Sequence, residues 1–202
     1  NGALAETPEI AAAPTDQTDP ALLGDVIVTA NRSAQAADRV GQSVTVLTTA
    51  DIQNSQAVAV ADLLVRTPGV TLSRNGGVGA ATSLRIRGAE TDQTVVVIDG
   101  VKLNDPSSTG GGYNAGNLLV GDIARIEVLR GAQSTLWGSQ AIGGVVDIQT
   151  ARPRRPLEAS LDAEAGERGT RYLRGGVGGA GERAVWRLAA SHFTTDGFST
   201  FA

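Results

Sequence analysis

His192 is the only histidine of the 202-residue chain, so any Ser-His-Asp triad would have to use it. It lies near the end of the chain in an alternating run, where a polar strand residue is the simpler interpretation. The run 176–181 reads Gly-Val-Gly-Gly-Ala-Gly and formally matches a dinucleotide-binding pattern, but no helical pattern follows it. The sequence has no Gly-Lys-Ser/Thr phosphate loop and no cysteine to act as a thiol nucleophile or zinc ligand. These residues predict that the chain is not an enzyme.

The composition argues against a nucleic-acid-binding protein and against a transmembrane helix. The net charge is −4, and Lys102 is the only lysine, which argues against a nucleic-acid-binding surface. No run of 18 apolar residues occurs, so the sequence predicts no transmembrane helix. Glycine is abundant, with 26 residues, whereas aromatic residues make up only 3%, a balance that favours a small-residue sheet with many tight turns.

Strand-like and helix-like runs alternate from residue 43 to residue 150. Short β-prone runs are expected at 44–47, 70–73, 83–87, 94–98, 101–103, 123–129 and 144–150. Short helices are expected after the N-cap hydroxyls of Thr48 and Thr49, over 58–66, and at 132–137.

Three signals within this region are specific. Asp99-Gly100 between β-rich runs predicts a two-residue hairpin turn. The five β-branched residues 94–98 predict a strand that is buried on both faces. The helix over 58–66 should end near Thr67, because Pro68 disfavours helical geometry in the residue before it.

The pattern changes after residue 156. Three runs with alternating apolar and polar residues cover 159–165, 171–179 and 184–191, as in the strands of a membrane β-barrel. An ordinary antiparallel meander is the alternative. Three strands cannot close a barrel, so we expect the chain to be a fragment. Trp186 is expected near a membrane interface, and the alternative is a buried tryptophan of a sandwich.

The N-terminal region combines a polar leader with one isolated β-prone segment. Residues 1–24 are rich in Ala, Pro, Thr and Asp and predict disorder. The segment Asp25-Val26-Ile27-Val28-Thr29-Ala30 follows directly. It either docks on its own domain or adds as a strand to a partner's sheet.

Five blocks together resemble TonB-dependent outer-membrane receptors, and within that family the cobalamin receptors. They are 25–30 (DVIVTA), 84–88 (LRIRG), 97–101 (VIDGV), 126–131 (IEVLRG) and 136–148 (LWGSQAIGGVVDI). Each block alone is weak, but all five occur in the family's order and spacing. The resemblance covers roughly residues 25 to 195.

The resemblance implies the fold and the domain boundaries. The expected fold is an α+β plug domain, a small mixed sheet with short helices, followed by the first antiparallel strands of a transmembrane β-barrel. The expected divisions are a disordered leader at 1–24, a TonB box at 25–31, the plug at 32–152 and incomplete barrel strands at 157–202. A leader of 24 residues is too short for the extra domain that signal-transducing members carry.

The resemblance also implies functional residues. Residues Asp25, Val26, Ile27, Val28, Thr29 and Ala30 are expected to bind the C-terminal domain of TonB, although a strand of the plug's own sheet is the alternative. Arg87 and Arg130 are expected to form ion pairs between plug and barrel, or else to be solvated.

The expected substrate contacts lie in two loops of the plug, 74–83 and 104–114. The candidate residues are Arg74, Asn75, Ala81, Ser83, Glu90, Ser108, Thr109 and Tyr113. Glu90 departs from the neutral amide that cobalamin receptors carry there, and could favour a cationic ligand or be solvated.

The implied activity is active transport of a scarce large solute across the outer membrane of a Gram-negative bacterium. Cobalamin is the first expected substrate and a ferric siderophore the alternative. The expected partners are TonB and outer-membrane lipid, with no nucleic acid. No cofactor is expected in this chain, although calcium could bind extracellular loops outside it. A soluble plug-like binding module without a barrel is the rival architecture.

Overall fold

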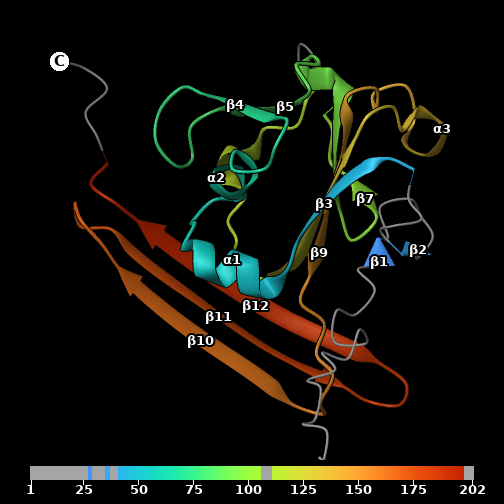
Figure 1. Ribbon diagram of the computed structural model, residues 1–202. Helices are drawn as coiled ribbons and strands as arrows, with labels where there is room; N and C mark the ends of the chain where they lie inside the picture. The colour runs from blue at the N-terminus through green and yellow to red at the C-terminus, as the bar shows by residue number, and fades with distance from the viewer. Residues whose placement is uncertain (1–26, 29–34, 37–40, 106–110, 198–202) are drawn as a thin grey trace, which may run out of the picture.

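The computed structural model describes residues 27–28, 35–36, 41–105 and 111–197. A central mixed sheet carries the helices and loops of the N-terminal domain, and a separate antiparallel sheet from the C-terminal part of the chain lies along one side of it (Figure 1). Among the described residues, no helix has the length and hydropathy required to cross a bilayer.

The central sheet has five strands. They are β3 (Ser43–Leu47), β6 (Thr94–Ile98), β7 (Val101–Lys102), β8 (Ile123–Arg130) and β9 (Gly144–Thr150). The order across the sheet is β3-β8-β9-β6-β7, and only β6 and β9 run parallel. This order places β3 at one edge, with β8 as its single neighbour.

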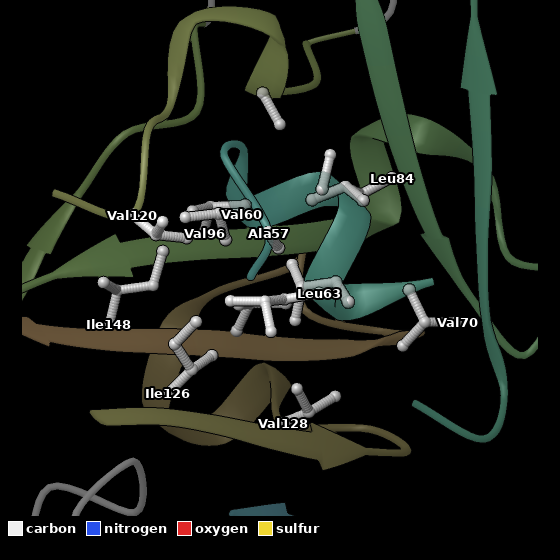
Figure 2. Close-up of a cluster of buried hydrophobic side chains, with 14 of the residues drawn as sticks. Ala57, Val60, Leu63, Val70, Leu84, Val96, Val120, Ile126, Val128 and Ile148 are labelled. Atoms are coloured by element: carbon white, nitrogen blue, oxygen red, sulfur yellow. The ribbon is translucent and has the colours of Figure 1, made fainter. Parts of the chain in front are cut away.

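Both faces of this sheet are covered by apolar side chains. Val95, Val96 and Val97 of β6 are at most 1% exposed, which confirms the predicted strand buried on both faces. On one face, Val96, Ile126 and Ile148 pack against Val60 of the second helix (Figure 2). On the other face, a smaller cluster includes Val95, Val97, Leu129 and Trp137. Apolar residues on both faces are typical of strands in the interior of a covered sheet, such as β6 and β9.

The helices are short. The helix α1 (Thr49–Ser55) begins after the N-cap Thr48, α2 (Val60–Leu64) presents Val60, Leu63 and Leu64 to the core, and α3 (Ser134–Trp137) is a single turn. The helix predicted from Val58 begins two residues later. The main-chain groups of Val58 and Val60 instead bond to Val120 and Leu118, which keeps Ala59 extended.

Two hairpins extend the fold. Strand β4 (Val70–Arg74) pairs with β5 (Thr82–Ile86) as a separate two-stranded ladder. Between β6 and β7, Asp99 and Gly100 have φ values of 48° and 86°. Positive φ at both positions is what a two-residue type I′ turn requires, so the predicted hairpin turn is confirmed.

The C-terminal sheet consists of β10 (Glu158–Ala165), β11 (Arg171–Ala180) and β12 (Val185–Thr194). The strand register places Leu161, Leu173 and Leu188 on one face, where they are 77%, 50% and 69% exposed. We call this the outward face. The predicted fold class, a mixed sheet with short helices followed by antiparallel strands, is confirmed.

The opposite, inward face of the C-terminal sheet contacts the N-terminal domain. Arg187 donates from Nε to Oδ1 of Asp122 at 2.6 Å, and both side chains are less than one quarter exposed. Tyr172 is buried and contacts Phe193 edge to face. A Cβ added at Gly121 would lie 3.1 Å from the Tyr172 hydroxyl, so glycine permits this close approach. Contacts at Gly121 and Asp122 therefore dock the domain onto the sheet.

Trp186 is the second residue of β12 and lies opposite Gly179, with about half of its surface exposed. It shares the outward face with Leu188, so the alternative of a tryptophan buried in a sandwich is wrong.

The N-cap of α1 gives a pH-dependent prediction. Thr48 donates from its main-chain N–H and its hydroxyl to the Asp51 carboxylate, and these bonds lower the pKa of Asp51. We expect Thr48→Ala to lower the free energy of unfolding by about 1 kcal/mol at neutral pH. A carboxyl group with a lower pKa in the folded protein stabilises the fold at pH values above its unfolded pKa of about 3.9. This stabilisation is lost as the pH falls through the pKa of the folded state.

Urea unfolding of the 202-residue chain from neutral pH to about pH 3 would measure this difference. The difference in the free energy of unfolding between wild type and Thr48→Ala should decrease at acidic pH. A difference that is the same at every pH would show that the Asp51 carboxylate plays no part in the cap.

Candidate functional site

Loops from three parts of the chain meet at one region of the N-terminal domain, on the side where β4 and β5 lie. This region is away from strands β1 (Ile27–Val28) and β2 (Gln35–Ala36) (Figure 1). We call residues 75–81, 90–93 and 111–117 the loop cluster. Gly79 donates to the carbonyl of Gly116 at 3.1 Å, and Thr82 donates its N–H to Oδ1 of Asn114 at 2.9 Å. The predicted loops 74–83 and 104–114 are therefore brought together by the Asn114 side chain, and a main-chain bond to Gly116 lies just beyond them.

Two asparagines fix the ends of the long loop that begins at residue 104. The Asn104 side chain accepts from Val96 N and donates to Thr94 O, which ties the start of the loop to β6. Asn114 accepts from both Thr82 N and Gly116 N and thereby ties the end of the loop to β5. Both amides hold main chain in place, a role that the sequence pattern alone did not identify.

Two glycines allow the loops to touch. A Cβ at Gly116 would lie 2.1 Å from Ala80 O, and a Cβ at Gly112 would lie 2.4 Å from Thr91 Cγ2. Neither position has room for a side chain, so a larger residue must separate the loops.

The predicted substrate residues differ in their surroundings. Asn75, Ala81 and Glu90 are exposed, whereas Ser83 and Tyr113 are half-buried. Burial raises the pKa of Tyr113, so its phenol remains a hydrogen-bond donor at neutral pH. Ser108 and Thr109 lie outside the described residues.

Arg74 is held within the domain. Its NH1 lies 2.9 Å from Oδ1 of Asp62, its Nε donates to Thr82 Oγ1, and its side chain is 15% exposed. These contacts brace the β4–β5 ladder against α2. Ligand contact by Arg74 stays a prediction.

Arg130 is almost fully buried and is surrounded by neutral oxygens. Its guanidinium donates twice to Ser43 Oγ, at 3.1 and 2.9 Å, to Thr45 Oγ1 at 2.7 Å and to Pro68 O at 3.0 Å. Burial, and then the nearby positive charge of Arg87, lower the pKa of Arg130. Within the described ranges, neither arginine is ion-paired with a carboxylate.

Ile27 and Val28, the described residues of the segment 25–30, lie apart from the central sheet. Strand β1 (Ile27–Val28) pairs antiparallel with β2 (Gln35–Ala36) in a ladder of its own. The alternative that this segment is a strand of the domain's main sheet is therefore wrong for Ile27 and Val28. Asp25, Val26, Thr29 and Ala30 lie outside the described residues.

A groove of about 920 Å³ lies near the start of α1, with Arg125, Asp147 and Gln149 in its lining. Glu127, opposite Asp147 in the sheet, is fully buried and bonded by Arg125 Nε at 2.8 Å and by Gln149. The carboxylate is thus held by a cation and an amide within the sheet, as expected for a structural charge.

The residues considered for catalysis do not form a site. His192 is exposed on the outward face, level with Leu173 and Ala163. The glycine run 176–181 lies in β11 and the turn after it, which leads into an antiparallel strand rather than a helix. The ion pair between Asp122 and Arg187 was missed, because no sequence signal links residues 65 positions apart.

Comparison with known proteins identifies the domain. Residues 36–145 match the model of the TonB-dependent Receptor Plug Domain family. The vitamin B12 transporter BtuB of Vibrio vulnificus strain YJ016 is 39% identical over 141 residues, which cover 70% of this chain and 22% of that protein. BtuB of Photobacterium profundum is 37% identical over 175 residues, which cover 86% of this chain and 28% of that protein. The chain thus spans about a quarter of the length of these curated relatives.

Solved structures show the same fold. The siderophore receptor PirA from Acinetobacter baumannii aligns with a TM-score of 0.62 and 26% identity, over 84% of this chain and 26% of PirA. FpvA of P. aeruginosa, bound to a pyoverdine, aligns with a TM-score of 0.69 and 23% identity, over 83% of this chain and 22% of FpvA.

The loop cluster gives a second prediction. Gly116→Ala should separate residues 75–81 from 111–117, because the new methyl group has no space beside Ala80 O. In the full-length protein we expect amide exchange in both loops to rise while β9 stays protected. Gly41→Ala, where an added Cβ meets nothing within 4 Å, is the matched control. Unchanged exchange in Gly116→Ala would contradict the packing described here.

Proposed function

The chain belongs to the TonB-dependent receptor family, and from this premise we propose that it forms the plug and first wall strands of an outer-membrane active transporter. One observation supports the proposal most strongly. The loop cluster and the β1–β2 ladder are two separate features of one domain, with the central sheet between them (Figure 1). A transporter that binds solute on one side and is driven from the other needs this separation.

The C-terminal sheet supports a location in the outer membrane of a Gram-negative bacterium. Its outward face exposes Leu161, Leu173 and Leu188, side chains that lipid would cover. Trp186, at the start of β12, fits an aromatic belt at the periplasmic interface. Arg187 and Tyr172 on the other face contact the plug.

We propose that residues 25–31 are the TonB box. Such a segment adds as a strand to the sheet of a partner, with main-chain hydrogen bonds that supply most of the affinity. The β1–β2 ladder consists of two residue pairs, so few main-chain hydrogen bonds must break before the segment can pair with a partner. The proposed partner is the C-terminal domain of TonB.

Cobalamin is the proposed substrate. The proposal rests on the relatives that are vitamin B12 transporters at 39% and 37% identity. A ferric siderophore is the second candidate, because PirA is a siderophore receptor at 26% identity. In either case we propose contact through the loop cluster, with Asn75, Ala81 and Glu90 exposed there.

Arg87 and Arg130 are proposed to face carboxylates of wall strands outside this chain. Two neighbouring positive charges, one of them largely buried, are costly without an acidic partner. Arg87 is the more exposed of the two and the more accessible to such a carboxylate.

The coupling role of the TonB box is tested by proline substitution. Ile27→Pro or Val28→Pro should abolish uptake by the full-length receptor while ligand affinity stays unchanged, because proline removes a main-chain donor. Ile27→Ala keeps that donor and should transport at close to the wild-type rate. Normal uptake by both proline variants would exclude the segment as the coupling site.

The substrate is tested by calorimetric titration of the full-length receptor. We expect saturable binding of cobalamin and none of a panel of ferric siderophores. Binding of a siderophore instead would replace cobalamin by the second candidate, whereas binding of neither would contradict both.

A further inference from the structure

One end of the C-terminal sheet carries two exposed arginines. It is the end where β9 leads into β10 and where β11 turns into β12 (Figure 1). The carbonyl of Arg155 accepts from Ala180 N at 2.8 Å, and Gly181 N donates to Ala184 O at 2.9 Å. These bonds place the main chain of Arg155 beside the turn that holds Arg183, and the side chains of both arginines are exposed.

An exposed tryptophan and an exposed leucine lie at the same end. Trp186 is 51% exposed, and Leu157, directly before β10, is 67% exposed. A Cβ added at Gly179 would lie 2.4 Å from Pro156 O and 3.0 Å from Trp186 Nε1, so glycine leaves room for the indole to lie across β11 beside Pro156. We call Arg155, Leu157, Arg183 and Trp186 the rim site.

The guanidinium groups of the rim site are not used by the fold. Elsewhere in the same sheet, Arg174 and Arg187 each pair with a carboxylate. Within the part of the chain that the structure describes, Arg155 and Arg183 form no ion pair. An exposed guanidinium without a carboxylate can donate two parallel hydrogen bonds to a phosphate.

Positive charge is in excess around the rim site. Residues 152–158 and 181–184 contain four arginines and two carboxylates, Glu158 and Glu182. Glu158 accepts from the main-chain N–H groups of Arg154 and Arg155 at 3.1 and 3.0 Å, so its carboxylate holds the turn before β10. This excess favours a ligand with a net negative charge over a zwitterionic one.

We propose that the rim site binds the phosphate of an anionic phospholipid in the leaflet that faces the periplasm. Arg155 and Arg183 donate to the phosphate, and Trp186 and Leu157 contact the glycerol and the first methylene groups below it. The ligand is a bilayer lipid rather than a free phosphate, because the arginines lie beside exposed apolar side chains that a soluble anion would leave in water. The inference rests on the proposed function for the position of the C-terminal sheet in the membrane.

Fluorescence quenching by brominated lipids tests the rim site in the full-length receptor. The receptor is placed in nanodiscs of phosphatidylethanolamine that contain a small fraction of brominated phosphatidylglycerol, or the same fraction of brominated phosphatidylethanolamine. The difference in emission between the receptor and its Trp186→Phe variant is the signal of Trp186. We expect brominated phosphatidylglycerol to quench this signal at least about threefold more strongly, and high salt to remove most of the preference.

Arginine substitutions assign the preference to the rim site. In Arg155→Gln/Arg183→Gln the two lipids should quench Trp186 equally, whereas Arg155→Lys/Arg183→Lys keeps the charges and should keep most of the preference. Arg171→Gln is the matched control. Arg171 is also exposed but lies at the other end of β11, roughly 27 Å from Gly179 along an extended strand, so the preference at Trp186 should not change.

Equal quenching by the two lipids in the wild-type receptor would overturn the proposal and leave the proposed function intact, because Trp186 would still lie in the bilayer. Quenching by neither lipid would place Trp186 outside the bilayer and would count against both. A preference that persists in Arg155→Gln/Arg183→Gln would overturn the role of these arginines. The effect of salt on the wild-type preference carries the test if that variant does not assemble.

Discussion

The structure depends on the burial of one small sheet on both of its faces. Strands β6 and β9 run side by side between two apolar clusters, and Val95, Val96 and Val97 have almost no exposed surface. Strands β6 and β9 each pair with two neighbouring strands, whereas β3 and β7 lie at the edges. The loop before β5 meets the loop after β7, and the side chains of Asn104 and Asn114 fix the second of these loops.

This arrangement divides the contacts of the domain among three neighbours. The loop cluster presents polar and glycine-rich main chain, where we propose that the ligand binds. The pair between Asp122 and Arg187 holds the domain against the C-terminal sheet, whose outward face is apolar. Residues 25–31, the proposed TonB box, precede the edge strand β3, which β8 and Arg130 hold in the sheet. In the proposed transporter, ligand binding, anchoring to the C-terminal sheet and coupling to TonB thus use different parts of one small fold. A movement of one part therefore does not require the contacts of the other two to break.

Much of the fold followed from local patterns in the sequence. The Asp99-Gly100 turn and the buried strand before it were predictable, because each depends on residues adjacent in the chain. The helix near Val58 was predicted too long, since its first residues bond to a segment 60 positions away. The hydroxyl partners of Arg130 and the partner of Asp122 could not be predicted either. Such pairs join residues whose distance is set only by the folded sheet, and hydroxyl groups carry no distinctive pattern.

The central claim is that ligand binding and coupling use separate parts of one domain, and measuring both activities in one variant tests it most directly. Deletion of residues 25–31 removes the proposed TonB box and leaves every residue of the loop cluster in place. The full-length receptor with this deletion should bind its ligand with wild-type affinity and should not take it up. Loss of ligand binding in the deletion variant, or uptake at the wild-type rate, would contradict the account.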